Sequence, residues 1–198
     1  MQITADQVKQ LREMTGAGMM ECKKALSETG GDVEKAIDAL RKSGAAKAEK
    51  RSGRTANEGR VDSYIHPGNR VGVLIEVNCE TDFVALTPEF EELVRNLAMQ
   101  AAAAGADYIQ REDVPAERIE RERAIYTAQL EEQGKPAAII AKIVEGKLDK
   151  FYSEICLLEQ PYIRDDKKTV GDLLKEAGSK TGENLVVRRF SRFRLGAE

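Results

Sequence analysis

The spacing of the apolar residues changes from a helical period to strict alternation, and this change constrains the fold most. Over residues 1–43, apolar side chains recur three and four positions apart, as on one face of an α-helix. Over residues 71–79 they alternate with other residues, as on one face of a β-strand. A chain with both patterns belongs to the α+β class, with its first helices preceding the sheet.

Residues 1–43 are predicted to form a bundle of three short helices. Each helix has one apolar stripe, and the stripes are Val8, Leu11 and Met14; Met19, Cys22 and Leu26; and Val33, Ala36, Ile37 and Leu40. The glycines of residues 15–18 and Gly30-Gly31 break the helical pattern between them. Asp32 is a favourable N-cap for the third helix. A bundle of this size is only marginally stable alone.

Residues 44–59 have no apolar stripe and are predicted to be an exposed basic linker, either irregular or helical in part. Residues 60–198 are predicted to be a core of antiparallel β-sheet packed with helices. Its clearest feature is a β-hairpin, with strands at residues 61–66 and 70–79 joined by Pro67-Gly68-Asn69. In the second strand, one face carries Val71, Val73, Ile75, Val77 and Cys79.

The other elements of the core are predicted mainly from residues that are typical of helix starts. Thr87-Pro88 and Thr169 are typical helix starts, and Pro115 and Pro136 are each predicted to be the first residue of a helix. Residues 108–110 are predicted to be a short strand. Residues 185–195 are predicted to be the last strand, with apolar residues on both faces.

Composition excludes several classes of function. The three cysteines are widely spaced and form no CxxC pair, so neither a zinc site nor a disulfide framework is expected. A single histidine, His66, beside a predicted turn, argues against a catalytic Cys–His pair. The chain contains no phosphate-binding loop, signal peptide or apolar stretch of membrane-spanning length. We therefore expect a cytoplasmic protein with no cofactor, no metal and no covalent chemistry.

The segment from Val77 to Ala85 is the one most suggestive of function. A buried strand runs directly into Asn-Cys-Glu-Thr-Asp-Phe, where polar residues surround one large aromatic side chain. We expect Asp82 to cap a short helical turn and Phe83 to project from the start of that turn. Two interpretations stay open at this point. Phe83 is either a core residue or an exposed apolar anchor that enters a pocket of a partner.

Two long motifs resemble the signatures of the elongation factor Ts family, in its short bacterial form. The second signature is similar to Glu-Val-Asn-Cys-Glu-Thr-Asp-Phe-Val-Ala at residues 76–85, and the first to residues 11–20 with residues 22–26. The likeness continues through residues 158–161 and 183–190 and covers essentially the whole chain. One departure is Leu86, because the family usually has a basic or polar residue there.

The resemblance implies a function and a set of residues. The family's members are guanine nucleotide exchange factors for elongation factor Tu, which bind its GDP form and displace Mg²⁺ and GDP so that GTP can bind. Thr81, Asp82, Phe83 and Val84 match the segment that disturbs the Mg²⁺ and phosphate contacts of the partner. The family's N-terminal bundle, which is UBA-like, docks on the GTPase domain. This implies a docking role for Leu11, Arg12, Met19 and Met20, although Leu11 and Met19 fit the bundle core equally well.

The basic stretch of residues 41–60, which includes the predicted linker, offers an alternative function. It has seven basic and two acidic residues, and its basic residues are Arg41, Lys42, Lys47, Lys50, Arg51, Arg54 and Arg60. Such a stretch is either a solvated linker or a surface for RNA or the ribosome. It has no interleaved aromatic residues to stack on bases, and the net charge of the chain is −3. No direct contact with nucleic acid is therefore expected.

The resemblance implies a homodimer, and with elongation factor Tu a 2:2 complex, because the family's longer members carry two related halves in the core and this chain resembles the short form with one; the last strand supports this. Leu185, Val187, Phe193 and Leu195 share one face of this strand, and Val186 and Phe190 share the other. A strand apolar on both faces is unsuited to an exposed edge. Either a second copy of the chain or the protein's own helices must cover it.

Overall fold

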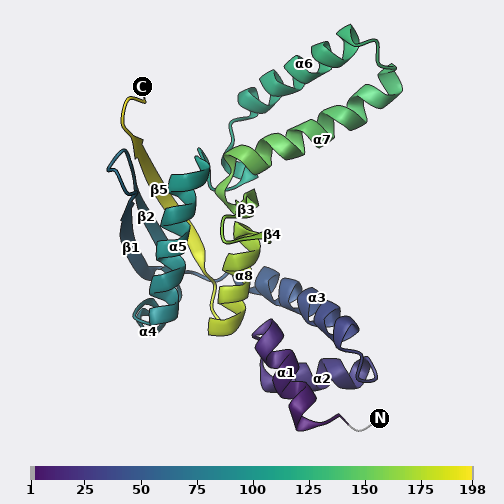
Figure 1. The fold of residues 1–198 in the computed structure, drawn as a ribbon, viewed down its shortest axis with the longest axis vertical. Helices are drawn as coiled ribbons and strands as arrows, with labels where there is room; N and C mark the ends of the chain where they lie inside the picture. Colours follow the sequence, from purple (N-terminus) through teal and green to yellow (C-terminus); the bar gives the residue numbers. More distant parts are fainter. Residues whose placement is uncertain (1–2, 198) are drawn as a thin grey trace. The chain divides into compact units, whose positions relative to one another are not determined.

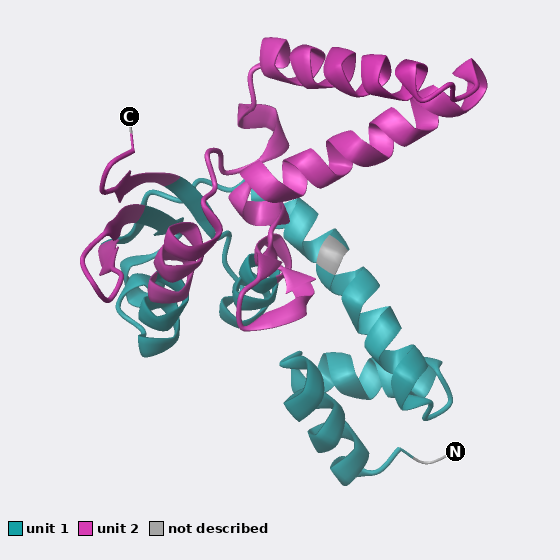
Figure 2. Cartoon of the chain, turned by 45° about the horizontal axis from the view of Figure 1, so that its top comes forward, with its two compact units in different colours: residues 1–61, 76–94, 173–188 teal, residues 62–75, 95–172, 189–198 magenta. Residues whose placement is uncertain are grey.

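The structure is a computed structural model that describes residues 3–197, except for the side chain of Ala45. The ends of the predicted bundle and core, Met1, Gln2 and Glu198, lie outside the described residues. The chain divides into two compact units, made of residues 1–61, 76–94 and 173–188 and of residues 62–75, 95–172 and 189–198 (Figure 2). The division predicted from the sequence, into a bundle of residues 1–43, a linker of residues 44–59 and a core of residues 60–198, stays a prediction.

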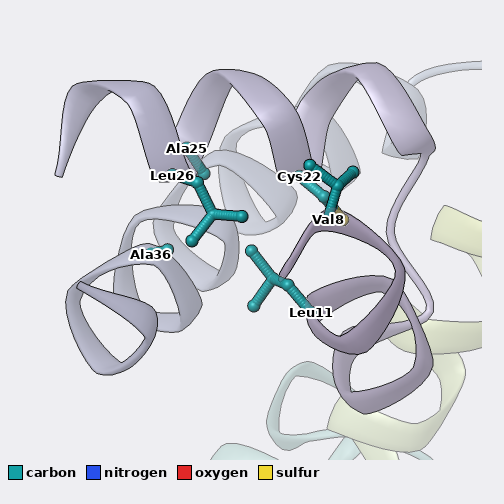
Figure 3. Packing of buried hydrophobic residues seen from close by; sticks show 6 residues of the cluster. All are labelled: Val8, Leu11, Cys22, Ala25, Leu26 and Ala36. Atoms are coloured by element: carbon teal, nitrogen blue, oxygen red, sulfur yellow. The ribbon is translucent and has the colours of Figure 1, made fainter. Parts of the chain in front are cut away.

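The predicted three-helix bundle is confirmed. Its helices are α1 (Ala5–Thr15), α2 (Met19–Glu28) and α3 (Val33–Ser52). Gly16 ends α1 with a φ of 68°, in the left-handed region that favours glycine. The Asp32 side chain caps α3 and accepts a hydrogen bond from the Lys35 backbone N–H at 3.1 Å. Six buried side chains fill the space between the helices, namely Val8, Leu11, Cys22, Ala25, Leu26 and Ala36 (Figure 3).

Helix α3 extends beyond the predicted bundle, which agrees with the prediction that the linker is helical in part. It has 20 residues and includes the first half of the predicted linker, up to Ser52. The alanine, lysine, glutamate and arginine residues of this part have high helix propensity and need no apolar stripe to continue an existing helix. Near its end, Arg51 is buried, and its guanidinium donates a hydrogen bond to the Ser179 hydroxyl at 3.1 Å.

The predicted hairpin is confirmed as β1 (Glu58–Ile65) and β2 (Val71–Cys79). Gly68 and Asn69 both have positive φ angles in the turn that joins the strands. The last strand is β5 (Val186–Arg194), and the sheet has the order β1-β2-β5 (Figure 1). The Leu195 N–H donates to the Arg70 carbonyl, so the end of β5 lies beside the start of β2. Val73, Ile75, Val77 and Cys79 are buried, as their shared face predicts.

Two helices begin where threonine caps were predicted. Helix α5 (Pro88–Ala104) begins after Thr87, whose hydroxyl accepts a hydrogen bond from the Phe90 N–H at 3.3 Å. Helix α8 (Val170–Thr181) begins after Thr169, which is bonded in the same way to the Asp172 N–H at 3.1 Å. Helix α5 contacts β1 through an Arg60–Glu91 ion pair at 3.2 Å.

Helices α6 (Ala116–Glu132) and α7 (Ala137–Ile155) form a long hairpin (Figure 1). Pro115 and Pro136 are their N-caps, so each helix begins one position after the predicted start. Leu130, Ile140, Val144 and Leu148 form the apolar contact between the two helices. An Arg123–Glu145 ion pair lies on the exposed surface of the hairpin.

Two features of unit 2 differ from the predictions. Residues 108–110 do not form a strand, because only Tyr108 pairs, in a single bridge with Cys156. A small sheet of β3 (Pro161–Tyr162) and β4 (Asp165–Thr169) was not predicted. Residues 164–168 are all charged, so they have no apolar alternation to mark a strand. The fully buried Gln100 side chain fixes this segment by binding the Pro161 carbonyl and the Ile163 N–H.

Over residues 3–197, no helix has the length and apolar character needed to cross a bilayer. The same residues contain no group of three or more His, Cys, Asp and Glu side chains placed to hold a metal ion. The three cysteines are buried free thiols.

Candidate partner-binding site

The candidate site is the short turn that follows β2, formed by helix α4 (Asp82–Ala85). The Thr81 hydroxyl caps this helix and accepts a hydrogen bond from the Val84 N–H at 3.3 Å. The sequence predicted Asp82 as the cap, which is wrong by one position. Asp82 is instead the first helical residue, where its negative charge favours the positive end of the helix dipole.

Phe83 projects into solvent, with 78% of its area exposed. Within this chain, its interpretation as a core residue is therefore wrong. Val84 and Ala85 are buried and attach the turn to the core of the protein. Leu86 is also 78% exposed and lies three positions after Phe83. The turn thus presents two large apolar side chains beside the exposed carboxylate of Asp82.

A single carboxylate from a distant part of the sequence holds this turn. One oxygen of Glu183 accepts hydrogen bonds from the N–H groups of Glu80, at 2.9 Å, and Thr81, at 3.2 Å. The other oxygen accepts a hydrogen bond from the Thr81 hydroxyl at 2.5 Å. Hydrogen bonds to an ionised group are shorter and stronger than neutral ones. The backbone just before Phe83 is therefore fixed at Glu80 and Thr81.

Cys79, the last residue of β2, is a structural residue of the site and not a nucleophile. Its side chain is fully buried, and its thiol donates a hydrogen bond to the Thr81 carbonyl at 3.1 Å. Burial, together with the negative charge of Glu183, raises the pKa of the thiol to about 11. At neutral pH the thiol is protonated and lacks the reactivity of a thiolate.

The predicted docking residues of the bundle divide into exposed and buried ones. Arg12 is exposed, as are Met19 (49%) and Met20 (73%). Leu11 is fully buried in the bundle core (Figure 3), so its side chain supports α1 from inside. Met14, which was predicted to lie on the core stripe of the first helix, is 59% exposed. Met14 is the next-to-last residue of α1 and Met19 is the first residue of α2, so three exposed methionines flank one turn.

Most of the basic stretch is occupied by contacts within the protein. Lys47 forms an ion pair with Glu21, and its hydrogen bond lowers the pKa of that carboxyl. Arg54 pairs with Glu80 at 3.3 Å. With Arg51 bonded to Ser179 and Arg60 paired with Glu91, four of the seven basic side chains have partners in the fold. This distribution favours a structural role over a phosphate-binding surface.

A second exposed apolar surface lies on the sheet, within unit 2. Ile65 of β1, Leu74 of β2 and Phe193 of β5 are each at least half exposed, as is Leu195 just after β5. Leu185 and Val187, which were predicted to share this face of the last strand, are buried. Only the second half of that strand is therefore available to a partner.

The comparisons with known proteins are consistent over the whole chain. The family model described as Elongation factor TS matches residues 2–197. Elongation factor Ts of Caldanaerobacter subterraneus subsp. tengcongensis is 61% identical over 194 residues, which cover 98% of this chain and 97% of that protein. Elongation factor Ts of Pseudothermotoga lettingae is 59% identical over 198 residues, which is the full length of both chains.

Elongation factor Ts of Geobacter sulfurreducens is 58% identical over 196 residues, which cover 99% of this chain and 91% of that protein. The matched length includes the Thr81–Val84 turn, the bundle and the last strand. The likeness noted in the two sequence motifs thus extends to every element of the fold. The chain belongs to the elongation factor Ts family of translation elongation factors.

Proposed function

We propose that this protein is a guanine nucleotide exchange factor for elongation factor Tu and acts without covalent chemistry. It binds the GDP form of that GTPase and displaces Mg²⁺ and GDP, so that GTP can bind. The observation that carries the proposal is the 78% exposed Phe83 on a turn fixed by three hydrogen bonds to one carboxylate. An apolar side chain held in this way is an anchor for a partner's pocket.

Each residue of the turn has a distinct part in this mechanism. Phe83 enters the partner, and the carboxylate of Asp82 lies next to it in the sequence, where it competes for groups that hold Mg²⁺ and phosphate. Those contacts hold a bound nucleotide most strongly, so disturbing them releases it. Thr81 caps the turn, and the buried Val84 attaches it to the core.

The exchange itself is a thermodynamic coupling between two ligands of one GTPase. If the exchange factor binds the nucleotide-free form more tightly than the GDP form, it must weaken GDP by the same factor. Weakening GDP about 10⁴-fold requires a difference of about 5.5 kcal/mol between those affinities. One buried aromatic anchor and a few desolvated polar contacts are of that magnitude.

The N-terminal bundle supplies the docking surface in this proposal. Arg12, Met19 and Met20 contact the GTPase domain, and the exposed Met14 extends the same surface. Methionine side chains are flexible and polarizable, and they adapt to a partner's surface. Leu11 acts indirectly, by holding α1 in the bundle.

We also propose that the protein is a cytoplasmic homodimer that forms a 2:2 complex with elongation factor Tu. Ile65, Leu74, Phe193 and Leu195 form an exposed apolar surface on adjoining strands of one sheet. Two such surfaces related by a two-fold axis cover each other. Nucleic acid has no place in the proposal, because most of the basic stretch is paired within the fold.

Isothermal titration with the two forms of the partner tests the exchange proposal. The protein is expected to bind nucleotide-free elongation factor Tu at least 100-fold more tightly than the Mg²⁺–GDP form. The preference should persist at high salt, since an apolar anchor is insensitive to ionic strength, whereas binding to RNA weakens steeply. Equal affinity for the two forms would contradict the proposal.

A further inference from the structure

Glu183 lies between α8 and β5, 102 residues away from the turn that its carboxylate holds. It does not belong to the Thr-Asp-Phe motif and shares no element with it. It nevertheless accepts the hydrogen bonds that the Glu80 and Thr81 N–H groups donate. Helix α4 has only four residues, which is too short to be stable without outside support.

We propose that Glu183 is a positioning residue for nucleotide exchange, which holds Phe83 in the orientation that enters the partner. The proposal rests on the proposed function of the turn. Without Glu183, the supports that remain include the hydroxyl cap of Thr81, the hydrogen bond from the Cys79 thiol to the Thr81 carbonyl, and the burial of Val84 and Ala85. None of these supports replaces the acceptor that Glu183 gives to the Glu80 and Thr81 N–H groups.

Glu183 is itself held by a reciprocal arrangement. The Glu80 N–H donates to Glu183, while the Asn184 N–H donates to the Glu80 carboxylate at 2.6 Å. Residues 80–81, at the start of the turn, are thus hydrogen-bonded to residues 183–184, just before β5. A functional side chain keeps its geometry more closely when the residue that supports it is itself held by hydrogen bonds.

The same arrangement includes Ser52, the last residue of helix α3, whose carbonyl accepts a hydrogen bond from the Asn184 side-chain amide at 3.4 Å, and Arg54 just after the helix. The Asn184 side-chain amide donates to the Arg54 carbonyl at 2.9 Å, and the Arg54 guanidinium donates to Glu80 at 3.3 Å. The last helix of the docking bundle is therefore bonded to the residues that fix the turn. The docking bundle and the turn that carries Phe83 are then held by the same network of hydrogen bonds.

The chemistry of the contact explains why the residue is a carboxylate. Three donors converge on Glu183, and a carboxylate offers two oxygens that only accept. A glutamine keeps one accepting oxygen for the two N–H groups but turns an NH₂ group toward the Thr81 hydroxyl. That hydroxyl already accepts from the Val84 N–H, so the third bond is weakened. Alanine removes all three bonds.

The experiment compares the full-length protein with E183Q, E183A and the control variant D172A. Asp172 accepts a hydrogen bond from the Thr169 N–H at the start of α8, so D172A also removes a carboxylate from a cap, away from the turn. The first measurement is amide hydrogen exchange in the free protein. We expect exchange at Glu80 and Thr81 to become at least about tenfold faster in E183A, with E183Q intermediate and D172A unchanged there.

The second measurement is GDP release from elongation factor Tu over a range of exchange-factor concentrations. A misplaced anchor lowers the maximal rate, by about 10- to 100-fold in E183A, and changes the half-saturating concentration less. A merely structural residue would instead give the same result as D172A. Normal amide protection and a normal maximal rate in folded E183A would overturn the proposal, as would an equal loss in D172A.

Two further results keep the test decisive. If circular dichroism shows that E183A does not fold, E183Q carries the test, and its full agreement with the unsubstituted protein in both measurements overturns the proposal. If Phe83→Ala leaves GDP release unchanged, the proposed function of the turn fails. The amide measurement on the free protein then still decides whether Glu183 holds the turn.

Discussion

Replacing Phe83 with alanine shows whether its side chain contributes to binding a partner or to the stability of the fold. Phe83 is 78% exposed, so about a fifth of its area is buried within the chain. Full burial of such a side chain stabilises a fold by about 1.5–3 kcal/mol, so this truncation should lower the free energy of unfolding by less than about 0.6 kcal/mol. Loss of an interface anchor typically costs about 2 kcal/mol or more. GDP release from elongation factor Tu should therefore slow by about 30-fold or more.

The assay pairs two measurements on one variant with a matched control. Urea unfolding gives the stability, and displacement of a fluorescent GDP analogue gives the exchange rate per concentration of exchange factor. Leu86→Ala is the control, because Leu86 has the same 78% exposure and lies three positions away. We expect it to slow release less than tenfold. The reasoning is refuted if Phe83→Ala exchanges normally, if it unfolds, or if Leu86→Ala is equally impaired.

Three other predictions concern separate parts of the molecule. Met20→Asp should weaken binding to elongation factor Tu by at least about tenfold at unchanged stability, because it places a charge on a surface that is buried against the partner on binding. Unchanged affinity in titration calorimetry would show that Met20 is not part of the interface. Phe193→Asp should convert a dimer of about twice 21.9 kDa into a monomer in sedimentation equilibrium, because a charge in the contact is left unpaired; a monomeric unsubstituted protein with full activity would end the dimer proposal. Burial raises the pKa of Cys79 and Cys156 to about 11 from an ordinary 9.0, so their contribution to stability is present below pH 9 and is lost as the pH rises through about 11. Urea unfolding between pH 8 and 11 should show this loss, and a flat profile would contradict it.

The elements that the sequence predicts well are those with local signals. Thr87, Thr169 and Asp32 begin helices because each side chain bonds to a backbone N–H three residues later. The alternation in β2 predicts its buried face, because side chains of a strand point alternately to its two faces. These relations involve neighbouring residues, so one sequence is sufficient to recognise them.

The features that the sequence missed depend on distant partners. Arg51 belongs to the linker that was predicted to be exposed, and it is buried against Ser179. The charged strand β4 exists because it pairs with β3, a segment fixed by the buried Gln100. No local pattern contains those contacts.

The candidate site shows the same division. The motif located the turn, but it placed the cap on Asp82, because both Thr81 and Asp82 are residues that cap helices well. It could not show whether Phe83 points inward or outward, since an aromatic residue after a strand suits either position. Glu183 was part of a likeness noted in the sequence, and only the fold brings its carboxylate to the turn.

The most direct test of the account is the release of labelled GDP from elongation factor Tu with and without this protein. One molecule of exchange factor should release GDP from many molecules of the GTPase in the presence of excess unlabelled nucleotide. The rate should rise with the concentration of the protein and then saturate, and the protein itself should bind no nucleotide. A release rate that is the same with and without the protein, under conditions in which the two proteins form a complex, would contradict the account.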